Sequence, residues 1–191
     1  KVGYLKDQPY EQVRVFTCEG YLGGLLNTFG FQNHSFYQLN KLISKNYFAK
    51  KINEILINEK IDIIHAHSLY FGYLASYIQA SVPVIFTPMG SDVILHAQER
   101  GIYNRMAHRA FLYADVVTGD SELLQKKGFE LGAKKENNYI VQNGVDASVF
   151  YPKSNDLKNK YQVEENEILI FSPRAIDPIY NIDVIINSIA Q

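Results

Sequence analysis

Two histidines separated by a single residue are the first side chains along the chain with a recognisable chemical use. His65 and His67 end the apolar segment IDIIHAH, which has the composition of a strand, and side chains two positions apart on a strand point to the same face. Such a pair can ligate a metal, pack at the edge of a sheet, or donate hydrogen bonds to a ligand in a cleft. No further cluster of Asp, Glu, His or Cys has the spacing of a metal site, so the sequence favours packing or a cleft over a metal.

The segment VPVIFTPMGSD combines a strand pattern with turn and helix-start residues. Residues 82–87 form a β-branched run typical of a strand buried on both faces of a parallel sheet, and Pro88 marks where pairing should stop. Gly90 allows a sharp turn or a close approach to a ligand. Ser91 and Asp92 are both good N-caps for the helix expected next, where backbone N–H groups favour an anion. Asp92 is therefore either a helix cap or a substrate ligand.

Two later positions also have chemical potential. Arg174 follows an apolar segment and a proline, and its guanidinium suits either bidentate recognition of a phosphate or a surface salt bridge. Asn143 and Gly144 end another apolar run and form a strong turn signal. The chain contains no nucleophile elbow, P-loop or HExxH motif, and it lacks the phosphate fingerprint that an NAD-dependent dehydrogenase carries at its first strand–helix turn.

The elements that must position these residues alternate between strand and helix patterns. Strands are expected at 13–17, 61–65, 82–87, 115–118 and 139–142, and helices at 39–60, 69–80, within 92–113, and from Ser121 to about 131. This alternation predicts a doubly wound, parallel α/β sheet with its site at the carboxyl ends of the strands.

Composition narrows the function classes. The 191 residues carry 19 Lys and Arg against 20 Asp and Glu, and the net charge of −1 gives no support for general nucleic-acid binding. The lone Cys18 excludes an internal disulfide framework and is typical of a reducing compartment. No run of 18 apolar residues or signal peptide is present. Five lysines lie at 41–60, which predicts either a solvated helix face or a contact with a membrane surface.

The pattern changes after Phe150. Residues 153–160 are polar and charged, as in a linker or a surface helix, and they are followed by a strand pattern at 168–171 and an apolar helix pattern at 181–190. One strand and one helix cannot bury a core alone. We therefore expect a first domain at 1–150 and, at 151–191, a linker with the start of a second, truncated domain.

Five segments, in order, resemble motifs of the family 4-like retaining glycosyltransferases of the GT-B fold. IDIIHAH is similar to the strand end written pDviHaH in that family, and PVIFTPMGSD is similar to its P-x-x-x-T-x-x-G-S-D segment. ADVVTGDSELLQKKGFELGA resembles its aD-x-vi-x-xS segment, YIVQNGVDASVFYP its NGvD-x-x-x-F-x-P run, and FSPRAIDPIYNIDVIINSIA the opening of its second domain. The matches cover roughly residues 61–191.

The resemblance implies two Rossmann-like domains with a cleft between them. The first domain would bind the acceptor and the second a nucleotide diphosphate sugar. Residues 90–92 would line the cleft near the sugar and acceptor, and His67 would lie at its wall. Asn143 and Gly144 would lie near the interdomain crossover, and Arg174 would contact the donor diphosphate. The family needs no metal or other cofactor, because basic side chains and helix N-termini stabilise the leaving diphosphate.

The sequence departs from the family pattern at two positions. Met89 stands where the family often has His, and Tyr180 stands where a Lys commonly accompanies the arginine. The paired catalytic glutamates of the family belong beyond residue 191, so the resemblance assigns no catalytic residue here. Glu122 and Glu130 have the matching spacing, but their place on a helix of the first domain indicates surface residues.

The resemblance therefore predicts a fragment, inactive alone, of an enzyme that transfers a sugar with retention from a nucleotide diphosphate sugar to a glycan or lipid-linked acceptor. A nucleotide-sugar epimerase of the same architecture and a non-catalytic acceptor-binding or membrane-docking subunit are the alternatives. The expected location is the cytoplasm, with the helix at 41–60 as the contact to the inner face of a membrane.

Overall fold

The protein is described by a computed structural model that covers residues 2–4, 14–16, 34–97, 101–152 and 157–189. The chain divides into two compact units, Lys1–Gly144 and Val145–Gln191, each of which is described by itself. Cys18 lies outside the described residues.

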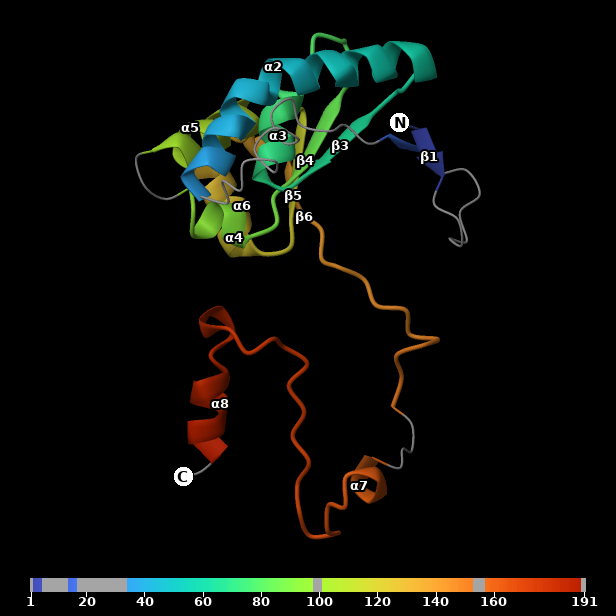
Figure 1. The fold of residues 1–191 in the computed structure, drawn as a ribbon, viewed down its shortest axis with the longest axis vertical. Coiled ribbons are helices and arrows are strands. Elements are labelled where there is room, and N and C mark those ends of the chain that lie inside the picture. The colour runs from blue at the N-terminus through green and yellow to red at the C-terminus, as the bar shows by residue number, and fades with distance from the viewer. Residues whose placement is uncertain (1, 5–13, 17–33, 98–100, 153–156, 190–191) are drawn as a thin grey trace. The chain divides into compact units, whose positions relative to one another are not determined.

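The first unit is built on a parallel sheet of four strands in the order β3-β4-β5-β6 (Figure 1). These strands are β3 Ile64–His67, β4 Val84–Thr87, β5 Val116–Gly119 and β6 Asn138–Ile140. In register, His67 lies beside Thr87, Phe86 beside Val117 and Gly119 beside Ile140. The sheet and its flanking helices confirm the predicted Rossmann-like α/β fold.

Strand β4 begins later than predicted. The N–H of Ile64 donates to the carbonyl of Pro83 at 2.9 Å. Pro83 has no N–H of its own to continue the ladder, so regular pairing starts at Val84. For the same reason β3 begins at Ile64 instead of Ile61, and it continues to His67.

Three helices cover one face of the sheet because consecutive parallel strands are joined by right-handed crossovers. They are α3 Leu69–Ala75, α5 Ile102–Tyr113 and α6 Glu122–Glu130. Phe86 and Phe111 are fully buried between helix and sheet, with ring centroids 5.0 Å apart and nearly perpendicular. Gly72 lets α3 approach the sheet, since a Cβ there would lie 2.5 Å from the Phe86 ring.

The remaining helices agree with the sequence-based predictions in part. Helix α2 spans His34–Glu59, and Ser121 caps α6 as predicted by accepting a hydrogen bond from Leu124 N–H at 3.4 Å. The single helix expected within 92–113 is instead divided into α4 Ser91–Ile94 and α5, with Gly101 at the N-cap of α5. A short 3₁₀ turn, η1 Lys135–Asn137, precedes β6.

The strand predicted near residue 13 is present but does not join this sheet. Strand β1 Val2–Tyr4 pairs with β2 Arg14–Phe16, and the pair is antiparallel. The four parallel strands follow chain order, so the reversal of strand order that a doubly wound sheet contains does not fall among them.

The second unit contains α7 Leu157–Lys160, the 3₁₀ turn η2 Pro178–Tyr180 and α8 Ile182–Ile189. The helix predicted at 181–190 is confirmed, but the strand predicted at 168–171 is wrong. Ile168 is 85% exposed and Phe171 81% exposed. A strand needs a neighbour for its backbone hydrogen bonds, and the described part of this unit offers none.

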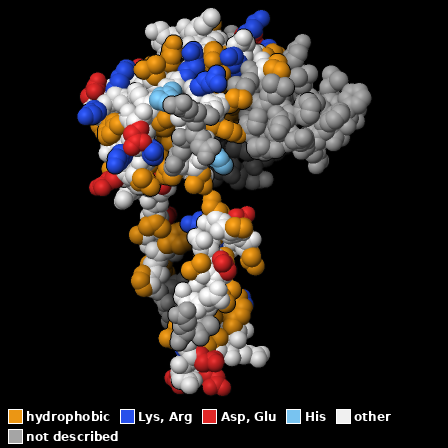
Figure 2. Space-filling model, turned by 90° about the vertical axis from the view of Figure 1, so that its left-hand side faces the viewer, with side chains coloured by type: hydrophobic (Ala, Val, Ile, Leu, Met, Phe, Trp, Pro, Cys, Tyr) orange, Lys and Arg blue, Asp and Glu red, His pale blue; other side chains and the backbone are white. Residues whose placement is uncertain are grey.

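The outer surface of the first unit is mixed, with Lys, Arg, Asp and Glu side chains set among hydrophobic ones on the face shown in Figure 2. Within the described ranges, no helix has both the length and the apolar character needed to span a bilayer.

Candidate functional site

The carboxyl ends of the parallel strands bring the predicted residues of the first unit to one edge of the sheet. Strand β3 ends at His67, β4 ends three residues before Gly90, and β6 is followed by Asn143 and Gly144. The backbone joins the first two of these strand ends directly, because Ser68 N–H donates to Thr87 O at 3.0 Å. Arg174 belongs to the second unit and is described apart from this edge.

Asp92 connects the two loops that leave β3 and β4. Its Oδ2 accepts a hydrogen bond from Leu69 N–H at 2.6 Å, and its Oδ1 accepts one from Met89 N–H at 3.0 Å. Leu69 is the first residue of α3, so the carboxylate satisfies an N–H that this helix leaves unpaired. The prediction that Ser91 or Asp92 occupies the N-cap of its own helix is wrong, because Gly90 occupies that position.

The turn around Gly90 is open to solvent. Gly90 has a φ of 87°, a conformation that side chains with a Cβ rarely adopt, and a Cβ built there meets no atom within 4 Å. Met89 is 64% exposed and Ser91 is exposed. The turn therefore leaves room for a ligand to approach the backbone.

Charge at this turn disfavours the anion that the sequence suggested. Helix α4 is only four residues long, and the Asp92 carboxylate already lies in its first turn. A phosphate placed there would face that negative charge at close range. Neutral hydroxyl groups, which can both donate to a carboxylate and accept from backbone N–H groups, suit the turn better.

His65 and His67 stack on each other at the end of β3. Their ring centroids lie 4.1 Å apart with a tilt of 39°, as expected for side chains two positions apart on a strand. His65 Nε2 lies 2.8 Å from Thr87 Oγ1, which is in turn hydrogen-bonded to Thr118 Oγ1. His67 therefore stacks on the ring of His65, which is linked through Thr87 of β4 to Thr118 of β5.

Thr87 and Thr118 were not singled out from the sequence, although a signal existed. Each is the polar residue that follows an apolar run, in VIFT and DVVT respectively. Because Phe86 pairs with Val117, the two threonines that follow them are also neighbours and share a face. Predicting their contact requires the strand register, which the sequence alone did not supply.

The environment of His65 favours its neutral form. Partial burial is the main cause that lowers the pKa of His65, and the charge of His67 lowers it further. A positive charge on His67 repels a second positive charge on His65, which is why it lowers the pKa of His65. Across the described ranges, no group of three or more His, Cys, Asp and Glu residues could hold a metal ion.

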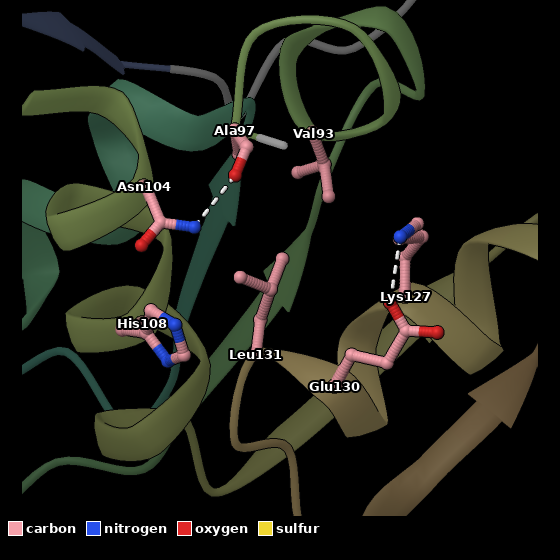
Figure 3. A pocket seen from close by; sticks show the side chains of 7 residues that line it. All are labelled: Val93, Ala97, Asn104, His108, Lys127, Glu130 and Leu131. Atoms are coloured by element: carbon pink, nitrogen blue, oxygen red, sulfur yellow. Dashed lines mark hydrogen bonds and ion pairs between the residues drawn. The ribbon is translucent and has the colours of Figure 1, made fainter. Parts of the chain in front are cut away.

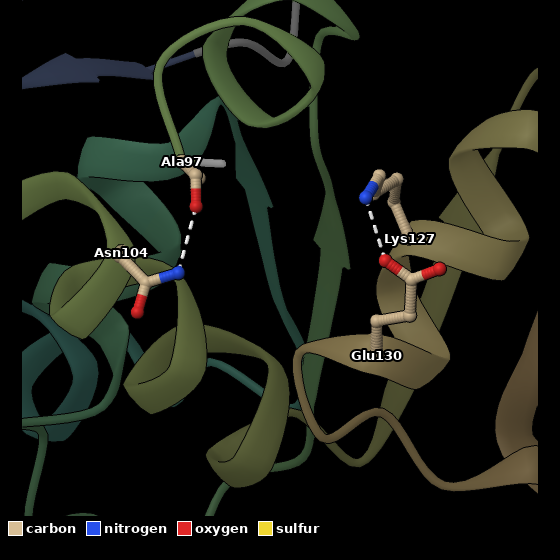
Figure 4. A network of polar contacts seen from close by, with 4 residues as sticks. All are labelled: Ala97, Asn104, Lys127 and Glu130. Carbon is tan, nitrogen blue, oxygen red and sulfur yellow. Dashed lines mark hydrogen bonds and ion pairs between the residues drawn. The ribbon is translucent and has the colours of Figure 1, made fainter. Parts of the chain in front are cut away.

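A hollow of about 150 Å³ lies on the helical side of the first unit, between α4, α5 and α6 (Figure 3). Two polar contacts brace its walls (Figure 4): Asn104 Nδ2 donates to Ala97 O at 2.8 Å, and Lys127 pairs with Glu130 at 2.6 Å. Hydrogen bonding from Lys127 is the main cause that lowers the pKa of Glu130. Glu122 and Glu130 are both exposed, which confirms that they are surface residues.

The lysines of α2 do not form a uniform solvated face. Lys45 Nζ donates to Tyr77 Oη at 3.1 Å, and Lys51 pairs with Glu54 at 2.7 Å. The side chain of Lys41 lies outside the described residues. Lys45 keeps its charge, but Lys51 is neutralised by Glu54, so α2 offers a membrane fewer unpaired charges than the sequence suggested.

Arg174 in the second unit lies over an aromatic ring. Its guanidinium carbon is 5.2 Å from the ring centroid of Tyr180, and both side chains are exposed. The contact is a cation–π interaction that leaves the outer edge of the guanidinium open to a ligand. Asn143 and Gly144, at the end of the first unit, are exposed as well. The turn predicted at these two residues is wrong, because the chain forms no turn there and the next turn lies at 147–149.

Comparison with protein families gives one match that covers most of the chain. The model described as Glycosyltransferase Family 4 matches residues 9–149. This range includes His67, residues 90–92, Asn143 and Gly144, and it ends before Arg174. Comparison with curated protein sequences gives no match.

Proposed function

Because this chain belongs to glycosyltransferase family 4 and is thereby a glycosyl-transfer domain, we propose that its first unit holds the acceptor during transfer of a sugar from a nucleotide diphosphate sugar. The transfer retains the configuration of the sugar, and residues 145–191 belong to the part that binds the donor.

The observation that carries this proposal is the clamp made by Asp92. Asp92 accepts hydrogen bonds from Leu69 N–H and Met89 N–H. It thereby holds the end of β3, which carries His67, beside the open turn at Gly90. A sugar hydroxyl can then reach the exposed ring of His67 while the sugar lies against the turn. Holding the acceptor in one orientation is what such a site contributes to the rate of transfer.

The charges of the two units support different binding roles, with the acceptor bound by the first unit and the donor by the second. The edge of the first unit carries a carboxylate and two imidazoles, which suit hydroxyl groups. Arg174 suits the leaving diphosphate, and the neighbouring Tyr180 adds an aromatic face where family members commonly add a second cation. Asn143 and Gly144 belong to the extended connection that follows β6. In this proposal no metal or cofactor takes part.

A glycan array tests the acceptor assignment. The chain, labelled with a fluorophore, is applied to immobilised glycans and glycolipids. We expect retention on a subset of carbohydrates, with binding lost in His67→Ala and reduced in Gly90→Val, because a Cβ is strained at a φ of 87°. His108→Ala, an exposed histidine on α5, is the matched control. Absence of any carbohydrate ligand would contradict the proposal.

A transfer assay with radiolabelled nucleotide sugars tests the donor assignment. We expect negligible transfer by this chain alone, because the described side chains of 145–191 are exposed or only partly buried and enclose no donor pocket. Robust transfer would show that this inference about the second unit is wrong. Conversion of the nucleotide sugar without any acceptor would instead indicate an epimerase.

A non-catalytic subunit is the second candidate. The exposed side chains described within residues 145–191 favour it, because they form no binding site for a donor by themselves. In that case, the chain would bind the acceptor and a separate protein would bind the donor. Co-purification of a partner that restores transfer distinguishes this candidate from a self-sufficient enzyme.

A further inference from the structure

Helix α5 has a solvent face that its packing does not explain. Ile102, Arg105, Arg109, Leu112 and Tyr113 recur at spacings that place them on one side of an α-helix. Ile102 is 45% exposed, Leu112 60% and Tyr113 54%. Three large apolar side chains thus lie in solvent beside two arginines.

The full charges that α3 and α5 bring to this face have one sign. Helices α3 and α5 contain no Asp or Glu, and their only full charges are Arg105 and Arg109. Lys45 of α2 adds a third cation, lying 4.6 Å from the ring centroid of Tyr77. Glu130 of α6, which lines the hollow of Figure 3 together with His108, is paired with Lys127 of the same helix.

A second hollow opens between α3 and α5 on this face. It measures about 280 Å³ and is lined by Tyr73, Tyr77, Ile102, Arg105, Met106 and Arg109.

One wall of this second hollow is rigid. Arg109 Nε donates to Ser76 Oγ at 2.8 Å, and Nη2 donates to Ser76 O at 3.1 Å. The same guanidinium lies 4.1 Å from the Tyr77 ring centroid and 4.5 Å from that of Tyr113. Arg105, one turn earlier on α5, is exposed beside it.

We propose that this face of α5 docks on an anionic lipid bilayer. A headgroup phosphate occupies the hollow between Arg105 and Arg109, while Ile102, Leu112 and Tyr113 enter the boundary between headgroups and acyl chains. Cationic and apolar side chains on one helix face are the combination that binds a membrane surface. The proposal moves the membrane contact from the lysines of α2 to α5.

The exposed apolar side chains of Ile102, Leu112 and Tyr113 favour a bilayer over other polyanions as the ligand of this face. Nucleic acids and acidic glycans present phosphate or sulfate groups in water, so they would leave Ile102 and Leu112 exposed. A bilayer buries both the charges and the apolar side chains. This inference goes beyond the proposed transfer reaction and does not depend on it.

Co-sedimentation with vesicles tests the proposal. The chain is mixed with vesicles of phosphatidylcholine alone or of phosphatidylcholine with phosphatidylglycerol, and the bound fraction is measured at low and high salt. We expect binding only to the anionic vesicles and weaker binding at high salt. Arg105→Ala should lower the partition coefficient roughly fivefold, and Leu112→Ser should lower it by about as much through lost apolar burial.

Matched controls separate docking from folding and from general charge. Lys126→Ala removes one exposed positive charge from α6 and should leave binding unchanged. Circular dichroism establishes that Arg105→Ala and Leu112→Ser remain folded, which we expect since both positions are exposed. Arg109 is left intact because it holds the end of α3.

Three results would overturn the proposal. The first is equal binding to neutral and anionic vesicles, and the second is anionic binding that neither substitution weakens. The third is binding to inorganic phosphate or dextran sulfate with none to vesicles, which would mean that the hollow takes a free anion or a polyanion instead of a bilayer.

Discussion

Asp92 organises the carboxyl edge of the parallel sheet through one side chain. Both of its oxygens accept backbone hydrogen bonds, one from the start of α3 and one from the loop after β4. A carboxylate that accepts from two N–H groups fixes their separation, and so fixes how far His67 lies from the Gly90 turn. Sequence reasoning assigned Asp92 to a helix cap or a ligand, and it could not show that the helix being capped is α3.

Replacing Asp92 should destabilise the fold measurably. Asp92→Ala leaves the N–H groups of Leu69 and Met89 without their acceptor, and we expect a loss of about 1–3 kcal/mol in the free energy of unfolding. Urea denaturation followed by circular dichroism measures it. Asp62→Asn, an exposed carboxylate before β3, is the control and should change little. Identical midpoints for Asp92→Ala and the unsubstituted chain would contradict the clamp.

His65 gives stability a pH dependence of known sign. Burial and the neighbouring His67 lower its pKa in the folded state below the usual value of about 6.5. The unfolded state therefore binds the proton more tightly, so the contribution of His65 is fully present above about pH 6.5 and falls as the pH drops through that value.

The measurement compares urea denaturation at about pH 7.5 and about pH 5.5 in the unsubstituted chain and in His65→Gln. Carboxylates contribute equally to both proteins, so the difference isolates His65. We expect the substituted chain to lose less stability on acidification. An equal or larger loss in His65→Gln would contradict the argument.

At the scale of elements, helix α3 shows how closely a helix can approach a sheet. Gly72 faces the Phe86 ring, where an added Cβ would lie only 2.5 Å away. The sequence predicted a helix at this position and gave no reason for a glycine inside it. The reason is the packing between two elements, which a periodic pattern does not contain.

Gly72→Ala should be destabilising although alanine favours helices. Overpacking against Phe86 costs about 1–3 kcal/mol, which exceeds the gain of about 1 kcal/mol in helix propensity for most of that range. Thermal unfolding measures the net effect. Gly144→Ala, where an added Cβ meets no atom within 4 Å and no helix is capped, should be close to neutral. A more stable Gly72→Ala would mean that the contact is looser than described.

The elements divide into those that local signals determine and those that need partners. The N-cap at Ser121 was predictable because its hydroxyl acts within one helical turn. The start of β4 followed from Pro83 only once the neighbouring strand was known. The failed strand at 168–171 had suitable residues, but the described part of its unit contains no strand to pair with. The contact between Thr87 and Thr118 likewise depends on register.

At the scale of the whole molecule, the alternation of strand and helix was sufficient to predict the parallel sheet and the edge at which the candidate residues meet. The motifs around His67 and residues 90–92 predicted the family, which the match over residues 9–149 confirms. The roles of the individual site residues are still predictions, because they depend on a ligand and on how the two units meet.

The central claim is that a carbohydrate acceptor binds at the carboxyl edge of the parallel sheet. Nuclear magnetic resonance tests it most directly, by titrating the isotope-labelled chain with a carbohydrate selected on the glycan array. The account predicts saturable shifts in the ring of His67 and in the backbone amides of Met89, Gly90 and Ser91. Shifts confined to other surfaces of the first unit, with these four positions unchanged, would contradict it.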